Sequence, residues 1–240
     1  MRTVKIIIRK ELNTAFNSWS TYIGFLLFFC ICGFISWLSS SNIFYLGQAS
    51  MMPFFIVISW TTFIMVHTLT MKSIADEKRN GTLELLLTKP IKTHQLIGGK
   101  FLSQLILIAI ALCMTLPYYF TVATLGHIDI APVILGYFGL ICINACYISI
   151  GIFASSLART AATAFFISLG IGLCFQLLFG ILAQQSGNGF IAGLLTYLSI
   201  DEHFDSLSRG ILDTRDVVYF ISVITLFLSL YKFFICKIRH

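Results

Sequence analysis

The sequence predicts an all-α polytopic membrane protein. Hydrophobic residues make up 58% of its 240 residues and charged residues only 11%, whereas a soluble domain carries roughly 25% charged residues. Several uncharged apolar stretches are long enough to cross the hydrocarbon core of a bilayer, about 30 Å thick, as helices. These stretches do not alternate between apolar and polar residues, as the strands of a membrane barrel do. Helices are therefore the expected spanning elements.

Six segments are candidate transmembrane helices, and together they are expected to form a single domain over residues 1–240. The segments are Tyr22–Leu38, Met51–Met71, Phe101–Leu125, Val133–Leu157, Ala161–Ala183 and Val217–Phe234. A very short connection near Ala158–Thr160 separates the fourth segment from the fifth, which predicts a tight helical hairpin.

The distribution of lysine and arginine predicts that both termini are cytoplasmic. With that topology, fourteen of the sixteen basic residues lie on the inner side, and only Arg209 and Arg215 lie outside. This is the asymmetry that the positive-inside rule describes, and the inverted topology would expose the fourteen instead. The net charge of +6 is thus explained by topology and by anionic lipid headgroups rather than by nucleic acid.

Residues 1–20 have the pattern of an amphipathic helix that lies flat on the membrane. Apolar side chains recur every three or four positions, and basic or amide side chains occupy the opposite side. The apolar set is Val4, Ile7, Ile8, Leu12, Ala15, Phe16 and Trp19. Two interpretations fit this pattern: a simple lipid anchor, or a lever that links the first span to a cytoplasmic partner.

A charged segment, Ile74–Lys100, follows the second span. No helix breaker occurs between Met71 and Arg79, so the second span is expected to continue out of the membrane into water. Asn80-Gly81 then predicts a turn, because both residues tolerate a positive φ.

A short apolar helix is expected directly after that turn, over Leu83–Thr88. Thr82 is a suitable cap, Glu84 lies in the favourable first turn, and Lys89-Pro90 ends the helix. Such a short helix is not stable alone in water and needs a groove in lipid or on a protein. Gly98-Gly99 predicts a second turn, with Lys100 at the cytoplasmic end of the third span.

The segment 186–216 is expected to be amphipathic and extracytoplasmic. Phe204, Leu207, Ser208 and Ile211 fall on one helical face, and either Ser199 or Asp201 is a suitable cap. The segment forms either an outer amphipathic helix or a re-entrant pair with residues 188–195, and Asp213–Asp216 caps the last span.

The chain offers no catalytic residue, cofactor site or metal site. Gly98-Gly99-Lys100 is followed by Phe101, and position 94 is His, so the phosphate-loop motif is not matched. ATP is therefore expected to be bound by another protein. No span contains Asp or Glu, which a membrane-embedded hydrolase or a proton-coupled transporter would use.

Two polar residues inside the spans, His67 and Asn144, are candidates for lining a transport pathway. The alternative is a neutral histidine hydrogen-bonded to a neighbouring helix and an asparagine that holds helices together. Both interpretations fit the sequence.

Two motifs resemble those of a known family. Asp76–Pro90, followed by Gly99-Lys100, resembles the loop between the second and third helices of ABC-2 type transporter permeases. A second group of residues resembles the last outer segment of the gliding-motility-associated permease branch: Tyr197–Ser199, His203-Phe204, Ser206, Arg209-Gly210, Asp213, Arg215-Asp216 and Tyr219-Phe220. Arg9–Leu12 and Gly151–Leu157 also fit, so the resemblance covers essentially the whole chain.

The resemblance implies a six-helix ABC-2 transmembrane domain of the type V exporter kind. Residues 1–20 would be its connecting helix and residues 74–100 its cytoplasmic coupling loop. The implied ATPase-coupling residues are Glu77, Arg79, Gly81, Thr82, Leu83, Glu84, Leu86, Leu87 and Pro90, with a second contact at Arg159 and Thr160.

The resemblance also implies partners and a function. The partners would be two ABC ATPase subunits, a second permease copy or a related permease, and an auxiliary membrane protein, all in a bacterial inner membrane. The chain would then be a non-enzymatic permease subunit that couples ATP hydrolysis in its partner to export of an unidentified substrate. An alternative is an ATP-driven complex that exerts force on an envelope partner through the acidic outer segment and transports no solute.

Overall fold

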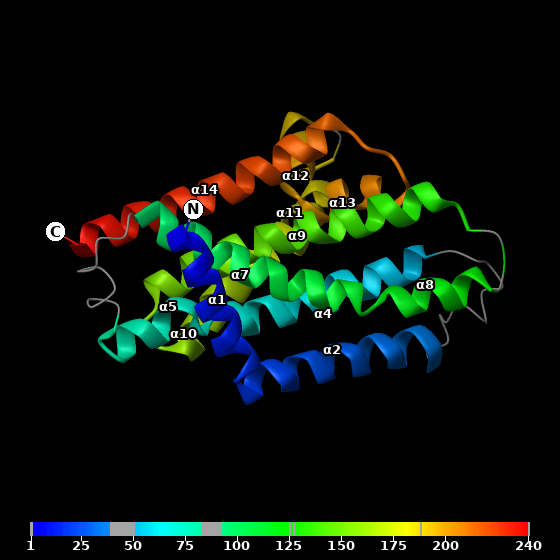
Figure 1. Ribbon diagram of the computed structural model, residues 1–240. Helices are drawn as coiled ribbons and strands as arrows, with labels where there is room; N and C mark the ends of the chain where they lie inside the picture. Colours follow the sequence, from blue (N-terminus) through cyan, green and yellow to red (C-terminus); the bar gives the residue numbers. More distant parts are fainter. Residues whose placement is uncertain are drawn as a thin grey trace.

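Figure 1 shows the computed structural model of the chain, which describes residues 2–38, 51–82, 93–124, 126, 128–187 and 189–239. Within these ranges every regular element is a helix, as the composition predicts. The helices are α1 (Arg2–Phe16), α2 (Trp19–Leu38), α4 (Met52–Thr70), α5 (Lys72–Arg79), α7 (Thr93–Cys113), α8 (Leu116–Ala123), α9 (Ile130–Leu157), α10 (Ala161–Leu173), the π-helical segment Cys174–Leu178, α11 (Phe179–Gln185), α12 (Phe190–Leu198), α13 (Ile200–Ser208) and α14 (Thr214–Arg239).

Six helical stretches in the described residues are long and apolar enough to cross a membrane, which confirms the predicted number. They are α2, α4 with α5, α7 with α8, α9, α10 with α11, and α14. The tight hairpin between the fourth and fifth spans is also confirmed, since α9 ends at Leu157 and α10 begins at Ala161.

The predicted turn at Gly98-Gly99 is wrong, because α7 begins at Thr93 and continues through both glycines. The reason is helix packing. A Cβ atom on Gly99 would lie only 2.7 Å from Cγ2 of Ile7 on α1, so the glycine lets the two helices approach closely. As a consequence Lys100 lies inside the helix and is buried, not at a helix mouth.

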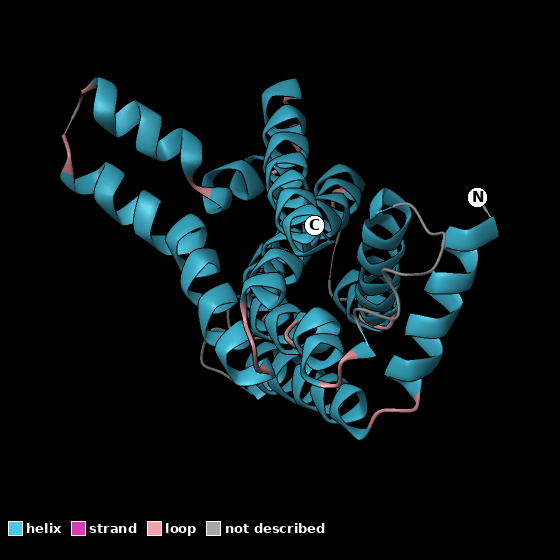
Figure 2. Ribbon diagram, turned by 90° about the vertical axis from the view of Figure 1, so that its left-hand side faces the viewer, coloured by secondary structure: helices cyan, strands magenta, loops and turns pink. Residues whose placement is uncertain are grey.

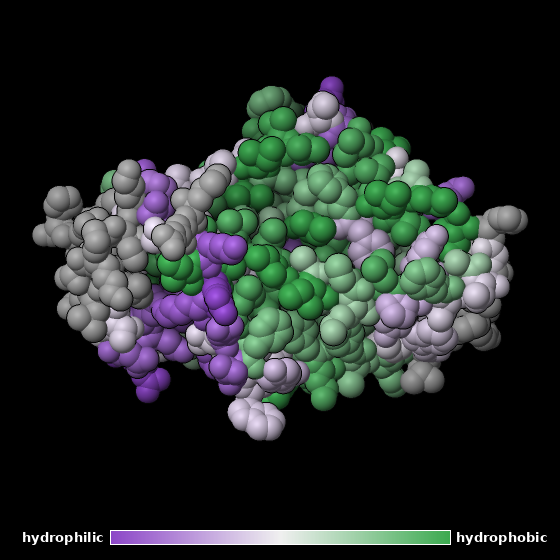
Figure 3. Space-filling model, viewed as in Figure 1, coloured by the Kyte–Doolittle hydropathy of each residue, from purple (hydrophilic) through white to green (hydrophobic). Residues whose placement is uncertain are grey.

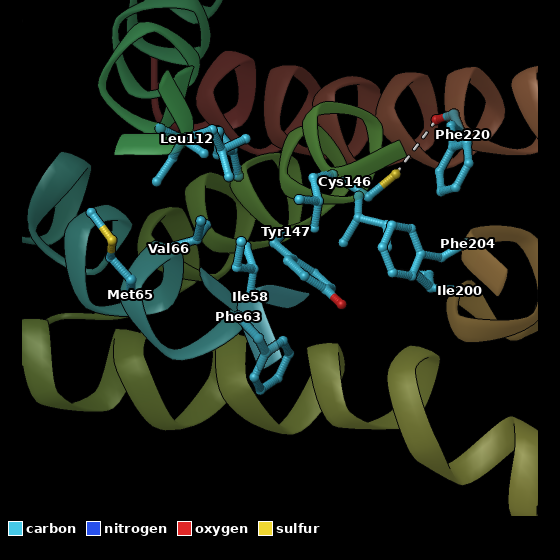
Figure 4. Close-up of a cluster of buried hydrophobic side chains, with 14 of the residues drawn as sticks. Ile58, Phe63, Met65, Val66, Leu112, Cys146, Tyr147, Ile200, Phe204 and Phe220 are labelled. Atoms are coloured by element: carbon cyan, nitrogen blue, oxygen red, sulfur yellow. Dashed lines mark hydrogen bonds between the residues drawn. The ribbon is translucent and has the colours of Figure 1, made fainter. Parts of the chain in front are cut away.

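The long helix α9 forms the centre of the bundle and contacts α4, α5, α7, α10, α13 and α14. Its side chains are buried on nearly all sides from Ile143 to Ser156, as expected for a helix that is apolar all round, whereas Ile134, Phe138 and Ile141 in its first half are exposed. Figure 4 shows part of this core, in which Tyr147 of α9 lies near Phe63 of α4, and Cys146 lies near Phe204 of α13 and Phe220 of α14. Elements far apart in sequence therefore share one core.

The segment expected outside forms two helices, α12 and α13, which meet at Ser199. Ser199 lies at the N-cap of α13 without a side-chain capping bond, and Asp201 lies within the helix. Phe204, Leu207 and Ser208 are buried as predicted. Ile211 is 60% exposed, contrary to the prediction, because the helix ends at Ser208 and a positive φ at Gly210 turns the chain away.

Two opposite ends of the bundle differ in charge. The basic end contains α1, α5, the 158–160 connection and the C-terminal part of α14. The region that we call the acidic end comprises α12, α13 and residues 209–216, and it lies away from the basic end although α8 and the start of α9 extend further (Figure 1). In Figure 3 apolar residues cover the middle of the molecule, and hydrophilic residues gather mainly toward the basic end. In Figure 2 a helical hairpin, α11 with α12, projects from the rest of the bundle.

α1 runs across the long direction of the spans (Figure 1). It ends at Phe16, and Trp19 belongs to α2, so the predicted helix over residues 1–20 is shorter than expected. Asn17 and Ser18 form the corner between the two helices.

Candidate functional site

A nearly continuous helical element crosses the bundle and ends at the basic end; it consists of α4 and α5 together (Met52–Arg79), and we call it the lever. The two helices are separated only by Met71, whose backbone is itself helical. At this break the Ser155 hydroxyl of α9 donates to the Met71 carbonyl and accepts hydrogen bonds from the amides of Ile74 and Ala75, each at 3.0 Å. All the hydrogen-bonding capacity of that hydroxyl is used, so α9 holds the joint of the lever directly.

A buried lysine joins the lever to two other helices. Lys100 of α7 is 1% exposed, and its Nζ lies 2.9 Å from Oε1 of Glu77 on α5 and 3.3 Å from Oε1 of Glu11 on α1. The same ammonium donates to the carbonyl of Ser73 at 2.7 Å. We call Lys100, Glu77, Glu11 and the Ser73 carbonyl the Lys100 junction.

The Lys100 junction explains why Glu11, Glu77 and Lys100 can lie within an apolar bundle. Lys10 lies 3.6 Å from Glu77 and 3.7 Å from Glu11, so both carboxylates face two ammonium groups. A buried ammonium is costly unless it is paired and hydrogen-bonded, and its removal leaves its partners uncompensated. Lys100 of α7 therefore ties α1 and the lever together at one point.

The lever ends in an open turn. Asn80 caps α5, and Gly81 has φ +67°, a conformation that favours glycine. Arg79, Gly81 and Thr82 are exposed, and the Thr82 hydroxyl donates back to the Glu77 carbonyl. The predicted short helix over Leu83–Thr88, with the coupling residues Leu83, Glu84, Leu86 and Leu87, and the Pro90 that follows it, lie outside the described residues.

The second predicted contact adjoins the lever. Arg159 and Thr160 are exposed, and Thr160 forms a reciprocal capping box with Thr163 at the start of α10. Small residues pack this connection against the lever: Ala75, Ala158 and Ala164 form a buried cluster beside Met71. The Lys78 ammonium also donates to the carbonyl of Ser156. The structure thus places α5, which leads into the first predicted contact region, beside the connection that holds Arg159 and Thr160.

The predicted coupling residues fall into two groups. Arg79, Gly81, Thr82, Arg159 and Thr160 are available to a partner, whereas the side chain of Glu77 is 14% exposed and turned toward Lys100. Sequence reasoning missed the roles of Glu11, Lys100 and Ser155. The only available signal was the isolated position of Lys100 at the edge of an apolar run.

His67 and Asn144 are both completely buried. The His67 ring lies edge-on to Phe63 with their centroids 4.5 Å apart, and a Cβ on Gly172 would lie 2.6 Å from its Nε2. Neither ring nitrogen has a hydrogen-bond partner within the described ranges. Asn144 donates to the carbonyl of Leu140 in its own helix at 2.7 Å. The role of the two residues in a pathway stays a prediction.

The acidic end has its own hydrogen-bond network, and it includes several residues of the outer-segment motif described in the sequence analysis. His203 Nδ1 lies 2.7 Å from Oδ1 of Asp216, and its Nε2 lies 3.0 Å from the Tyr197 carbonyl. The ring also stacks on Tyr219, with centroids 4.0 Å apart, and the Tyr219 hydroxyl donates to the Leu198 carbonyl. One histidine therefore joins α12, α13 and α14.

A second network reaches from the core to the acidic end. The Tyr147 hydroxyl donates to Gln176 Oε1, and Gln176 Nε2 donates to Oδ1 of Asp201 at 2.6 Å. Gln176 lies in the π-helical segment. Burial is the main cause that raises the pKa of Asp201 to about 6, Glu202 and Asp205 raise it further, and the Gln176 hydrogen bond lowers it.

These features define a class of protein: a multi-pass helical membrane protein whose second spanning helix continues beyond the apolar region to the exposed Gly81 turn, and whose sequence contains no phosphate-loop motif. The chain belongs to the ABC-2 family of transporter proteins, since the family model described as "ABC-2 family transporter protein" matches residues 5–235. No curated protein matches the chain. Membership makes it a membrane permease component of an ABC transporter, and such components work with an ABC ATPase.

Proposed function

We propose that this chain couples ATP hydrolysis by a separate ATPase to export of a substrate across a bacterial inner membrane. The basic end and both termini face the cytoplasm. The observation that carries the proposal is the unbroken connection from the exposed Gly81 turn to the centre of the bundle, through the lever, Ser155 and α9. Fourteen of the sixteen basic residues lie on the same side in this orientation.

The coupling works by displacement of a rigid element. The apolar segment after Gly81, residues 83–88, which the sequence predicts to be a short helix, would dock into a groove of the ATPase, and closure of the ATPase pair would push on it. The lever transmits the push to α9 through Ser155 and to α1 and α7 through the Lys100 junction. Because packed interfaces switch between discrete arrangements, a small shift at the basic end can reposition whole helices.

The complete assembly contains two ATPase subunits and a second permease, either another copy or a related chain. Support comes from the apolar surface of α10–α12, where Phe166, Phe190 and Ile191 are 72%, 87% and 68% exposed. A second permease or lipid would cover this surface. The motif at the acidic end supports the gliding-motility-associated branch, in which an auxiliary membrane subunit completes the complex.

The test uses the complex reconstituted with its ATPase. Gly81→Val forces a β-branched residue into a left-handed conformation, whereas Gly81→Asn tolerates it. Among the described residues no atom lies within 4 Å of a Cβ at Gly81, so the difference between the two variants comes from backbone conformation. We expect Gly81→Val and Glu84→Lys to insert normally but to lose ATPase attachment or coupling, while Gly81→Asn keeps both. Full substrate-stimulated ATPase activity in Gly81→Val and Glu84→Lys would refute the docking assignment.

A topology measurement tests the orientation independently. Lys89 and Lys92 should react with a membrane-impermeant amine reagent only from the cytoplasmic side. Labelling of these lysines from the periplasmic side would overturn the proposal.

A second candidate function is the transmission of force to an envelope partner without solute transport. It is favoured by the way α13 is built into the core: Ile200, Phe204 and Leu207 are buried in the same cluster as residues of α4 and α9. A push on the lever would therefore reach the acidic end. ATP-dependent solute flux in liposomes containing the purified complex would exclude this candidate.

A further inference from the structure

A polar cavity of about 390 Å³ lies at the basic end, between α1, α2, the lever and α7. It adjoins the Lys100 junction and extends from there toward the corner that joins α1 to α2. Most of the side chains that line it are charged or carry a hydroxyl or an amide. We call it the interfacial cavity, and its lining includes Ser20, Lys72, Ser73, Asp76, Glu77 and Gln104.

The buried part of the interfacial cavity offers hydrogen-bond acceptors that have no donor. Ser73 and Gln104 are only 8% and 9% exposed, and Ser73 Oγ and Gln104 Oε1 have no hydrogen-bond partner among the described residues. Oε2 of Glu77 is also buried and unpartnered, although Oε1 of the same carboxylate faces Lys100. Buried polar atoms without partners are unfavourable. Three of them in the lining of one cavity indicate an occupant that donates hydrogen bonds.

A lysine lies at the exposed side of the cavity. Lys72 is exposed, and its ammonium donates to the Ser20 hydroxyl at 3.3 Å. Within the described ranges neither Lys72 nor Asp76, one turn further along α5, has an ion-pair partner, whereas the charges of Lys10 and of the Lys100 junction balance one another. The cavity therefore has one unpaired positive and one unpaired negative side chain, which together suit a ligand that carries both charges.

The cavity lies at the level of lipid headgroups. Ser18 and Ser20 line it, and Trp19 between them is 84% exposed at the start of the first spanning helix. Tryptophan is enriched where a span meets the membrane–water interface. Figure 3 shows the hydrophilic residues of the basic end bordering the apolar middle of the molecule. A lipid of the adjacent leaflet can therefore place its headgroup in the cavity while its chains stay in the bilayer.

The donor that the cavity lacks is better supplied by an ammonium group than by a metal ion. Across the described residues, no three His, Cys, Asp or Glu side chains are placed to share a metal. A primary ammonium has three N–H donors, which equals the number of unpartnered acceptors in the cavity. Its hydrogen bonds to these acceptors are charge-assisted and therefore strong.

We propose that the interfacial cavity binds the phosphoethanolamine headgroup of phosphatidylethanolamine. The ammonium donates to Glu77, Gln104 and Ser73 in the buried part, and the α5 carboxylates provide the opposite charge. The phosphate faces Lys72 and the Ser20 hydroxyl at the exposed side. This matches the order of groups in the lipid, because the phosphate lies between the acyl chains and the terminal ammonium. Basic pockets between spanning helices are known sites for lipid headgroups.

The test counts lipids bound to the purified full chain, without its ATPase, by native mass spectrometry. One phosphatidylethanolamine should bind saturably, with an affinity about tenfold higher than that of phosphatidylcholine, whose trimethylated nitrogen donates no hydrogen bond, or of phosphatidylglycerol, which has no cation. Gln104→Leu and Lys72→Gln should each weaken binding about tenfold. The matched controls are Gln185→Leu on α11 and Lys232→Gln on α14, which are exposed and lie outside the cavity; both should bind like the wild type.

Thermal unfolding separates a loss of binding from a loss of folding. Because Gln104 Oε1 has no partner, Gln104→Leu should not lower the unfolding temperature in phosphatidylcholine. Phosphatidylethanolamine should raise the unfolding temperature of the wild type and of Gln185→Leu, and should leave that of Gln104→Leu unchanged.

Three results would overturn the proposal. The first is equal affinity for phosphatidylethanolamine and phosphatidylcholine, as expected for a cavity that holds only water. The second is equal affinity of Gln104→Leu and Gln185→Leu for phosphatidylethanolamine. The third is binding of free phosphoethanolamine as tight as that of the lipid, which would assign the cavity to a soluble ligand. These measurements contain no ATPase, so their outcome is independent of the coupling function.

Discussion

The Lys100 junction predicts a large and specific loss of stability when its ammonium is removed. Lys100→Met keeps the length and apolar stem of the side chain but leaves Glu77 and Glu11 without the partner that lies 2.9 and 3.3 Å away. Breaking a buried ion pair from one side costs about 3–5 kcal/mol. Because Lys10 stays within 3.7 Å of both carboxylates, we expect the lower end, about 3 kcal/mol.

The assay is equilibrium unfolding of the purified chain in nanodiscs or mild detergent. Lys10→Met is the matched control, since Lys10 contacts the same carboxylates but its side chain is 56% exposed; it should cost about 0.5 kcal/mol. In a double-mutant cycle, Lys100→Met with Glu77→Gln should show a coupling of about 2 kcal/mol, because each change alone leaves a buried charge. A cost for Lys100→Met no larger than that of Lys10→Met, or a coupling near zero, would refute the junction.

Two further predictions concern Ser155 and Asp201. Ser155→Ala should lower the free energy of unfolding by about 2 kcal/mol and accelerate hydrogen exchange at the amides of Ile74 and Ala75. The control is Ser156→Ala: the Ser156 hydroxyl donates to a carbonyl of its own helix, so this variant should leave both amides protected. Equal exchange in the two variants would contradict the role of Ser155. The pKa of Asp201 is raised from 3.8 to about 6 in the folded chain, so its contribution to stability is full below about pH 4 and is lost as the pH rises through about 6. Asp201→Asn should therefore stabilise the chain more at pH 7.5 than at pH 4.5 in thermal unfolding, and an identical change at both pH values would show that the carboxylate is not destabilised by burial.

The six spans could be predicted because uncharged length is a property of local sequence. The conformation of Gly98-Gly99 could not be predicted correctly, because the sequence does not distinguish a glycine pair that forms a turn from one that lets two helices pack closely. The deciding atom is in Ile7, on a helix distant in sequence. The end of α13 was misjudged for a related reason: the apolar spacing continues to Ile211, but Gly210 breaks the helix first.

The candidate site was only half accessible to sequence reasoning. The charged segment identified the region, and Asn80-Gly81 forms the expected turn with φ +67° at Gly81. The sequence could not distinguish a carboxylate that faces a partner from one that faces a lysine inside the bundle, because Glu77 and its neighbours look equally polar. That distinction depends on where α7 places Lys100, which is a property of the packed bundle.

The π-helical segment Cys174–Leu178 sets the direction of everything that follows it. A π turn holds one residue more than an α turn, so α11 is rotated by about 100° relative to a continuous α-helix. Deleting one residue from this segment would restore regular winding, turn Gln176 away from Tyr147 and Asp201, and swing the α11–α12 hairpin to another side of the bundle. The one extra residue of the π turn thus determines both that Gln176 points into the bundle and which side of the bundle carries the exposed apolar surface of the α11–α12 hairpin.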